Sequence, residues 1–376
     1  MNSLDATLLD YGAKSYTGPW KLIGLDYRVP HGHGKFTYET DQLTYEGSIE
    51  NGKAHGLGRR VWSDGYYEGE WFQGRMTGAG VFAKNCGRIY VGGFLDNKQH
   101  GRGISGGAGF QCYDGEWQHG LKSGEGVMHF DTGCIYIGHF KENKMHGIGS
   151  YTWNEFPGKD GKAKVYNGEW KCGKMSGHGI MECERGSYTG EWSDGQENGA
   201  GVFVYNGGII VSGIFKDGLA CGVCVQESAC KTEVYKGNFK NGLRDGYGIL
   251  SHETGCYYDG NFKENAMHGH GEYYWVDLKS ACNFVPFYIG EFEKGLQSGY
   301  GVFSNLRGVY EGFWKNGRKN GQGTYTYSNG DTLIGIYVDD LANGFCKSTL
   351  AATNEVFEGI FKNGVACLSM DTTNGV

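Results

Sequence analysis

The chain has 376 residues and a net charge of −7, with 69 glycines and 15% aromatic residues. This composition favours short strands and tight turns over helices, because glycine interrupts almost every helical window. Scattered lysines and arginines argue against a nucleic-acid-binding face, and no apolar run approaches the roughly 18 residues of a membrane helix. The N-terminus lacks signal-peptide features, so we expect a cytoplasmic protein whose 12 cysteines are reduced thiols.

Residues 1–15 precede the first recognisable unit and are predicted to be an N-terminal extension. Within them, residues 3–15 are the candidate for a short helix or cap. Tyr16 begins an interrupted unit that is lengthened by KLIGLDYRVPHG at residues 21–32. From there, residues 16–376 are expected to form one continuous repeat array.

A fourteen-residue pattern, clearest as YEGEWFQGRMTGAG at residues 67–80, recurs mostly every 22–24 residues. Such regular self-similarity is typical of repeat architectures. Together with the unit at Tyr16, about fifteen copies are expected. Clear copies begin at Tyr67, Tyr113, Tyr166, Tyr188, Tyr235, Tyr288 and Tyr310, weaker ones at Tyr45, Tyr90, Tyr136 and Tyr258, and degenerate ones at Val211, Leu333 and Phe357.

Alternation along the pattern predicts a β-hairpin. Tyr67, Gly69 and Trp71 share one strand face, while the glutamates between them face water. The turn falls at Gln73-Gly74, and Gly78, Gly80 and Phe82 are expected to share a face of the second strand. We expect each tyrosine or tryptophan ring to lie flat over neighbouring glycines. The predicted core residues are Tyr67, Gly69, Trp71, Gly78, Gly80, Tyr113, Gly115, Trp117, Tyr166, Gly168, Trp170, Tyr188, Trp192, Tyr310 and Trp314.

The consensus Y-x-G-x-W/F-x-x-G-x-x-x-G-x-G resembles the MORN repeat (membrane occupation and recognition nexus). This resemblance implies an all-β fold, an elongated, single-layer, twisted antiparallel meander of stacked β-hairpins. Polar turns ending in glycine, such as WSDG at 62–65 and YSNG at 327–330, predict equally tight connections between hairpins.

The spacing lengthens to 30 residues twice, from Tyr136 to Tyr166 and from Tyr258 to Tyr288. The two long units begin alike and lie 122 residues apart, which indicates an internal duplication of a five-repeat block. Their inserts, residues 154–165 and 276–287, are interpreted either as carriers of function or as tolerated surface loops.

Three patterns invite a chemical interpretation. Gly101, Gly103 and Gly106 match a nucleotide-binding pattern, but no helix follows. Cys221 and Cys224 form a C-x-x-C pair, which suits zinc or redox chemistry; the favoured interpretation is that Cys224 replaces a repeat glycine. Since no catalytic, metal or cofactor site stands apart from the repeat, we predict a non-enzymatic protein without a cofactor. Five histidines recur before a repeat glycine, too far apart to share an ion and favoured as polar turn-flanking residues, namely His31, His55, His100, His146 and His268.

The last unit ends in an apolar strand in place of the glycine pattern. Phe357, Phe361, Val365 and Leu368 are therefore predicted to form a homodimer interface, and MORN proteins of this type join through C-terminal repeats. The alternative is that residues 365–376 fold back as a cap. Two groups of basic residues are candidate contacts to anionic lipid, against the plain alternative of a solvated surface, namely Lys159, Lys162 and Lys164, and Lys315, Arg318 and Lys319.

A chain composed of such repeats resembles the protist MORN scaffold proteins, which organise cytoskeletal or membrane-associated cytoskeletal structures. The resemblance implies a cytoplasmic, cytoskeleton-associated scaffold at a basal body, a cortical structure or a cilium. Its expected partners are a second copy of itself and cytoskeletal or axonemal proteins, with no nucleic acid and no small-molecule substrate. The alternatives are a structural component of radial spokes or flagella and a phosphoinositide-binding membrane adaptor.

Overall fold

The computed structural model describes residues 12–24, 27–38, 43–154, 164–276 and 284–367. Across these ranges the regular elements are strands that follow one another in an antiparallel meander, so the predicted all-β fold class is confirmed. In the same ranges no helix has the length and apolar character that crossing a membrane requires. The predicted cap at residues 3–15 lies almost wholly outside them.

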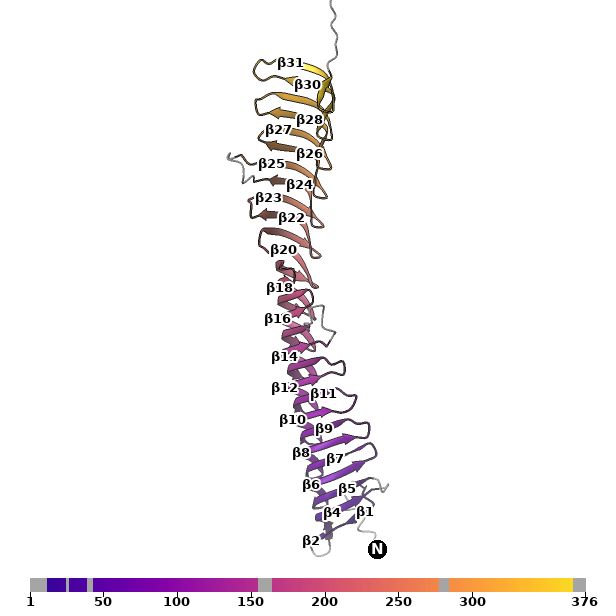
Figure 1. Cartoon of the computed structure of the whole chain (residues 1–376). Helices are drawn as coiled ribbons and strands as arrows, with labels where there is room; N and C mark the ends of the chain where they lie inside the picture. The colour runs from indigo at the N-terminus through magenta and orange to yellow at the C-terminus, as the bar shows by residue number, and fades with distance from the viewer. Residues whose placement is uncertain (1–11, 25–26, 39–42, 155–163, 277–283, 368–376) are drawn as a thin grey trace, which may run out of the picture. The chain divides into compact units, whose positions relative to one another are not determined.

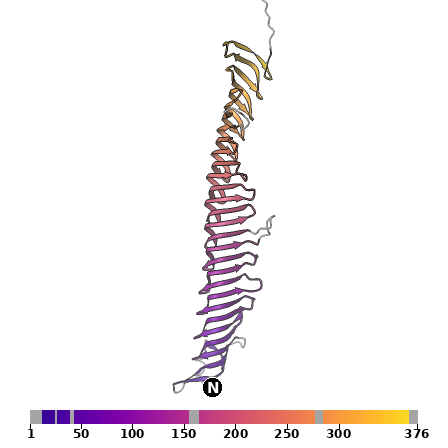
Figure 2. The ribbon, with the colours of Figure 1, turned by 60° about the vertical axis from the view of Figure 1, so that its left-hand side comes forward.

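The chain divides into two units, Met1–Glu184 with Trp192–Gly195, and Arg185–Glu191 with Gln196–Val376. Within each unit, hairpins are stacked in chain order (Figures 1 and 2). The strands that end before Glu184 are β1 (Ser15–Thr17), β2 (Trp20–Ile23), β3 (Tyr27–Pro30), β4 (Gly32–Thr37), β5 (Thr44–Glu50), β6 (Lys53–Trp62), β7 (Gly65–Phe72), β8 (Arg75–Lys84), β9 (Ile89–Leu95), β10 (Lys98–Gly106), β11 (Cys112–Gln118), β12 (Leu121–His129), β13 (Ile135–Lys141), β14 (Lys144–Thr152), β15 (Val165–Lys171) and β16 (Lys174–Cys183).

The later strands repeat the same hairpin plan. They are β17 (Gly186–Ser193), β18 (Gln196–Tyr205), β19 (Ile210–Lys216), β20 (Leu219–Glu227), β21 (Glu233–Lys240), β22 (Leu243–His252), β23 (Tyr257–Lys263), β24 (Ala266–Tyr274), β25 (Phe287–Glu293), β26 (Leu296–Asn305), β27 (Gly308–Lys315), β28 (Arg318–Tyr327), β29 (Thr332–Val338), β30 (Leu341–Thr349), β31 (Val356–Lys362) and β32 (Val365–Cys367). The lengthened first unit differs: β1 pairs with β4, and β2 and β3 form a small hairpin between them.

A row of paired glycines runs across the strands of each unit. In the first unit Gly58 pairs with Gly69, Gly69 with Gly80, and Gly80 with Gly92. The row continues through the other hairpins in the same register, for example from Gly149 to Gly168 and on to Gly179. Most strands in this row therefore meet their neighbours at a position without a side chain; Cys224 on β20 and Cys346 on β30 are exceptions.

Each repeat tyrosine covers one such glycine pair. Tyr67 is fully buried, and its hydroxyl donates to the carbonyl of Glu70 at 3.0 Å. A Cβ atom at Gly69 would lie 2.5 Å from the Tyr67 hydroxyl, and one at Gly80 would lie 2.6 Å from Tyr67 Cζ. The tyrosine ring thus fills the space that two missing side chains leave open, as expected for the tyrosines.

The tryptophans behave differently from the expectation that every ring lies flat. Trp71 stands edge-on to Tyr67 and Tyr45, with interplanar angles of 85° and 88°. Its indole Nε1 donates to the carbonyl of Gly58 in the preceding hairpin at 3.0 Å. An indole needs a partner for its N–H when buried, and this requirement together with edge-to-face packing sets the ring upright. The tryptophan therefore links successive repeats.

Gly78 does not share the tyrosine face, contrary to the sequence prediction. Gly69 pairs with Gly80 but Glu70 pairs with Thr77, so Gly78 and Ala79 form a β-bulge. Gly78 has φ of 55°, and a Cβ there would meet the Glu70 carboxylate on the opposite face. An extra residue in one strand shifts the alternation, so counting in twos from Gly80 fails at this position.

The hairpin turns have the predicted glycine geometry and also hold repeats together. Gln73 and Gly74 both have positive φ, 46° and 81°, as a type I′ turn requires. The Gly74 amide then donates to the carbonyl of Ala54 in the preceding hairpin at 2.8 Å. Where asparagine replaces the turn glycine, as at Asn97, its side-chain oxygen also accepts from the backbone N–H of Met76 at 2.8 Å.

Gly80→Ala should lower the stability of the array by about 1–3 kcal/mol, because its methyl group overlaps the Tyr67 ring. Gly207→Ala is the control, since no atom lies within 4 Å of an added Cβ. Urea unfolding followed by circular dichroism measures both. Equal urea midpoints for the two variants would show that the packing of Tyr67 tolerates a methyl group at position 80.

The buried tyrosines predict a loss of stability at alkaline pH. Burial raises the pKa of Tyr90, Tyr188, Tyr235 and Tyr310 to about 12, whereas an unfolded tyrosine titrates near 10. Between these values the unfolded chain releases protons that the folded chain keeps, so stability is intact below about pH 10 and falls as the pH rises toward 12. Core tyrosinate absorbance should rise together with loss of strand circular dichroism; ionisation in a chain that stays folded would contradict this.

Candidate functional site

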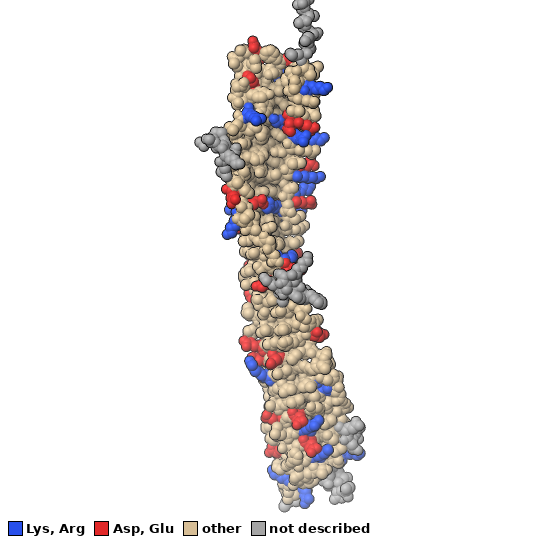
Figure 3. Space-filling model, in the orientation of Figure 1, with Lys and Arg blue, Asp and Glu red and all other residues tan. Residues whose placement is uncertain are grey.

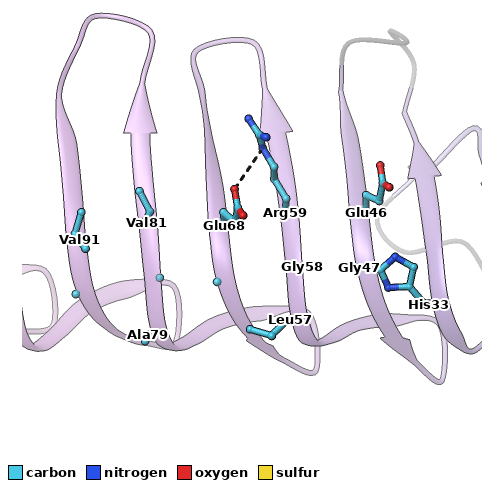
Figure 4. Close-up of a pocket in the computed structure, with 13 residues that line it drawn as sticks. His33, Glu46, Gly47, Leu57, Gly58, Arg59, Glu68, Ala79, Val81 and Val91 are labelled. Carbon is cyan, nitrogen blue, oxygen red and sulfur yellow. Dashed lines mark ion pairs between the residues drawn. The ribbon is translucent and has the colours of Figure 1, made fainter.

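The outer face, opposite the tyrosines, is hollowed along the glycine row. In the first unit one hollow of about 870 Å³ spans β4–β9 and another of about 560 Å³ spans β10–β15. In Figure 4 side chains such as Glu46, Val81 and Val91 stand over the strands, while glycines leave the floor bare. Arg59 and Glu68 point toward each other across it, with Nε and Oε2 3.9 Å apart. These shallow grooves offer surface for a macromolecular partner.

The glutamate between the repeat glycine and tryptophan supports the bulge, a role that alternation alone did not reveal. The carboxylate of Glu70 accepts the N–H of Ala79 at 3.0 Å. Glu169 accepts the N–H of His178 at 2.8 Å, and Glu191 that of Ala200 at 3.2 Å. The recurrence of this glutamate three residues after the tyrosine is the sequence signal that points to a structural task.

In the last hairpins this polar position becomes apolar and exposed. Phe313 and Ile336 occupy it, 49% and 52% exposed. Tyr300 and Phe345, at the middle position of the G-x-G pattern, are also apolar and exposed, whereas Gln322 keeps that position polar on β28. Tyr300 pairs with Phe313 across β26 and β27, with ring centroids 5.6 Å apart, and Phe345 pairs with Ile360. We call these five residues the C-terminal apolar stripe: Tyr300, Phe313, Ile336, Phe345 and Ile360.

The last described hairpin, β31–β32, leaves a core position open. Phe357 occupies the repeat tyrosine position but is 57% exposed, because the described part of the chain has no hairpin after β32 to cover it. Val365 on β32 is 69% exposed, and Phe361 is half-buried. Residues Val365–Cys367 extend the meander as a strand, so the fold-back alternative does not apply to them. Leu368 lies outside the described residues.

The described candidate lipid contacts of the second unit, Lys315, Arg318 and Lys319, do not share one face of the sheet. Lys319 lies on the tyrosine face, with its Nζ 5.0 Å from the Tyr310 ring centroid and 4.5 Å from that of Tyr325. Arg318 pairs with Asp339 at 3.9 Å, and Lys164 stacks over Trp153 at 4.6 Å. Lys315 is exposed on β27. The visible face in Figure 3 intersperses both signs of charge. Lys159 and Lys162 lie outside the described residues.

Two cysteines, Cys224 and Cys346, lie in the glycine row and are buried. Cys224 pairs with Gly213, and Cys346 with Gly335, at the places of repeat glycines. In both repeats the tyrosine is also replaced, by Val211 and Leu333. Burial raises the pKa of both thiols, so neither is a ready nucleophile. Across the described ranges, no group of three or more histidine, cysteine or acidic side chains is placed to hold a metal ion.

The two inserts leave the sheet in the same way, which supports the duplication. The backbone N–H of Asn154 donates to the Cys134 thiol at 3.4 Å, and that of Val276 to the Cys256 thiol at 3.2 Å. An aromatic pair precedes each insert with centroids 4.5 Å apart, Tyr151 with Trp153 and Tyr273 with Trp275. The central insert residues, 155–163 and 277–283, lie outside the described ranges.

The predicted core residues occupy equivalent places in their hairpins. The five tyrosines and five tryptophans of the prediction are all buried. Gly115 and Gly168 lie under Tyr113 and Tyr166 as Gly69 does under Tyr67. This tyrosine–glycine hairpin, repeated with its bulge and turn, defines a β-hairpin repeat protein.

Comparison with known families agrees with this class. The MORN repeat model matches twelve segments, residues 29–41, 45–65, 67–84, 90–105, 113–135, 136–155, 166–187, 188–209, 235–257, 258–278, 288–304 and 310–332. The chain therefore belongs to the MORN repeat family. The degenerate units at Val211, Leu333 and Phe357 fall outside these matches, yet each folds as a hairpin.

Relatives share parts of the chain. It is similar to alsin of Homo sapiens and of Rattus norvegicus, each 30% identical over 184 residues, which cover 47% of this chain but 9% of alsin. It is also similar to MORN repeat-containing protein 3 of Xenopus laevis, 37% identical over 71 residues, which cover 17% of this chain and 27% of that protein. These matches extend over far less than two thirds of either relative.

Phe313→Glu should keep the fold and change stability by no more than about 1 kcal/mol, because the new carboxylate can accept the bulge N–H of Gln322. Trp314→Glu, one residue on, is the control and should be severely destabilising because Trp314 is buried. Thermal unfolding compares them. A loss as large as that of the tryptophan variant would mean that Phe313 serves the fold and not the surface.

Proposed function

We propose that this chain is a non-enzymatic scaffold that presents an extended repeat surface to a cytoskeletal or membrane-associated cytoskeletal structure. The observation that carries the proposal is that different positions of each hairpin have separate roles. Tyrosine, tryptophan and glycine build the array, the carboxylate caps its bulge, and the remaining outer positions differ from repeat to repeat. Repeat arrays of this kind act by displaying such positions over a long surface.

Dimerisation through the C-terminal hairpins belongs to the same proposal. Phe357 on the tyrosine face and Val365 on the outer face are both exposed beside the edge of β32, which no described strand pairs with, and a second copy can cover this edge. Two antiparallel edge strands related by a twofold axis bury the same apolar residues from both copies. A dimer then carries two copies of the outer face, which raises avidity for a repetitive cytoskeletal partner.

A structural role in radial spokes or flagella, or phosphoinositide-dependent membrane attachment, remains the competing outcome of a localisation test. Within the second unit Arg318 pairs with Asp339 and Lys319 lies on the tyrosine face, which gives lipid attachment there little support. The proposed location is therefore a basal body, cortical structure or cilium, reached through protein contacts.

Val365→Lys should shift the mass measured by light scattering from dimer toward monomer, since it adds charge to the open edge strand. Leu57→Lys is the matched control, because Leu57 is also 69% exposed but lies on β6. Circular dichroism confirms that both variants fold. A wild-type monomer at micromolar concentration would refute the dimer.

Proximity labelling with the tagged full chain tests the cytoskeletal assignment. We expect tubulin-associated or cortical cytoskeletal proteins, and we expect their labelling to fall for the Phe313→Glu variant. A set dominated by axonemal spoke proteins, or by lipid-modifying enzymes with unchanged labelling in this variant, would replace the proposal by the corresponding alternative.

A further inference from the structure

A second kind of hollow lies on the tyrosine face of the first unit. It has a volume of about 580 Å³ and is bounded by residues of β8–β12 and the connections between them. Its apolar walls include Phe82, Tyr90, Phe110 and Trp117, and its polar lining includes Gln99, Ser105 and Gln111. A volume of this size, with apolar walls and a few polar groups, is typical of small-molecule sites.

Two cationic side chains line this hollow. Arg88 is exposed, with its Cζ 5.0 Å from the Phe110 ring centroid. Lys122 is half-buried, with its Nζ 5.0 Å from the Tyr113 ring centroid and 3.3 Å from the sulfur of Met128. Burial lowers the pKa of Lys122, and the charge of Arg88 lowers it further. Two like charges therefore share one partly desolvated space.

Two acidic groups lie near this hollow, and neither forms an ion pair with Arg88 or Lys122. Lys84 also lines the hollow but pairs with Asp64, at 3.2 Å. Asp131 is part of the lining, and its Oδ1 accepts the N–H of Thr132 at 3.0 Å. Within the described ranges, neither Arg88 nor Lys122 forms an ion pair with a carboxylate. With Lys84 paired, Arg88 and Lys122 stand against the single carboxylate of Asp131, so the lining keeps a net positive charge.

Equivalent hairpins show that this lack of a counter-charge is particular to Lys122. Arg244, at the same position on β22, pairs with Glu233 at 2.9 Å. Lys319 is at the same position on β28; burial lowers its pKa, and the charge of Asp340 partly offsets this effect. In the hairpin of Lys122 the residue matching Glu233 is Gln111.

The residue matching Asp340 is Asn143, whose side-chain oxygen accepts only the backbone N–H of Lys122, at 2.9 Å. Both positions that supply a carboxylate elsewhere therefore carry a neutral amide here. Buried or half-buried charges are ordinarily paired, and a bound anion would complete the arrangement at Lys122.

We propose that this hollow binds a small phosphate monoester, with the phosphate between Arg88 and Lys122 and the organic group against Phe82 and Phe110. A guanidinium fork and an ammonium group together suit a phosphate dianion, and Gln99 and Gln111 provide further neutral donors. A free ester in solution and the headgroup of a lipid present the same recognised chemistry. This site is independent of the scaffold and dimer proposals.

Isothermal titration of the full chain with phenyl phosphate tests the site, with inorganic phosphate and phenol as the two partial ligands. We expect phenyl phosphate to bind more tightly than either. Lys122→Met should weaken binding roughly 10- to 100-fold, as expected for loss of a charged hydrogen bond. Methionine is a safe substitute because it occupies this position in other hairpins, at Met76, Met145, Met175 and Met267.

Gln111→Glu is the second variant, because it supplies the counter-charge that Glu233 gives to Arg244. It should also weaken binding, although the lysine is retained. Lys319→Met is the matched control and should bind as the wild type does. Nuclear magnetic resonance of the lysine side chains should show the pKa of Lys122 rising on binding, and affinity should fall as the pH rises through that pKa.

Vesicles of phosphatidylcholine with and without a phosphoinositide identify the source of the ester. Cosedimentation that requires the phosphoinositide and Lys122 assigns a lipid headgroup. Binding of phenyl phosphate without cosedimentation assigns a soluble ester. The proposal is overturned if no phosphate ester binds at millimolar concentration, or if Lys122→Met and Gln111→Glu bind like the wild type.

Discussion

The packing of one tyrosine ring over a pair of cross-strand glycines is the interaction on which the other features of this fold depend. Tyr67 occupies the space above Gly69 and Gly80, and a side chain on either glycine would overlap it. The chain itself shows how strict this fit is. Where Cys224 and Cys346 take the second glycine position, Val211 and Leu333 replace the tyrosine, so volume added on one strand is removed from the other. Close-packed interiors require such compensation.

This packing leaves few residues of a hairpin free for other purposes. Trp71 links its repeat to the preceding one, Glu70 caps the bulge, and Gly74 closes the turn onto Ala54. Specificity must then come from positions where these constraints are relaxed. The C-terminal apolar stripe, the open hairpin β31–β32 and the cationic hollow at Lys122 are three such places. Each is recognised because equivalent hairpins show what the pattern would otherwise supply.

The sequence predicted the repeat, the hairpins, the turns and the tyrosine face, because period and alternation encode them directly. Gly78 was assigned to the wrong face, since a bulge shifts the alternation and nothing in a count of residues announces it. The upright setting of Trp71 depends on a carbonyl in another hairpin, 13 residues away. The closeness of Arg88 to Lys122 was missed for the same reason, because the two residues belong to separate hairpins that no local motif connects.

The tyrosine–glycine fit is tested most directly by transplanting the natural exchange into a regular repeat. The free energies of unfolding of Tyr67→Val, Gly80→Cys and the double variant are compared with that of the wild type. If the ring and the glycine are complementary, Gly80→Cys should cost about 1–3 kcal/mol alone but much less when Tyr67 is already valine, as at Val211 and Cys224. Costs that simply add would contradict the account.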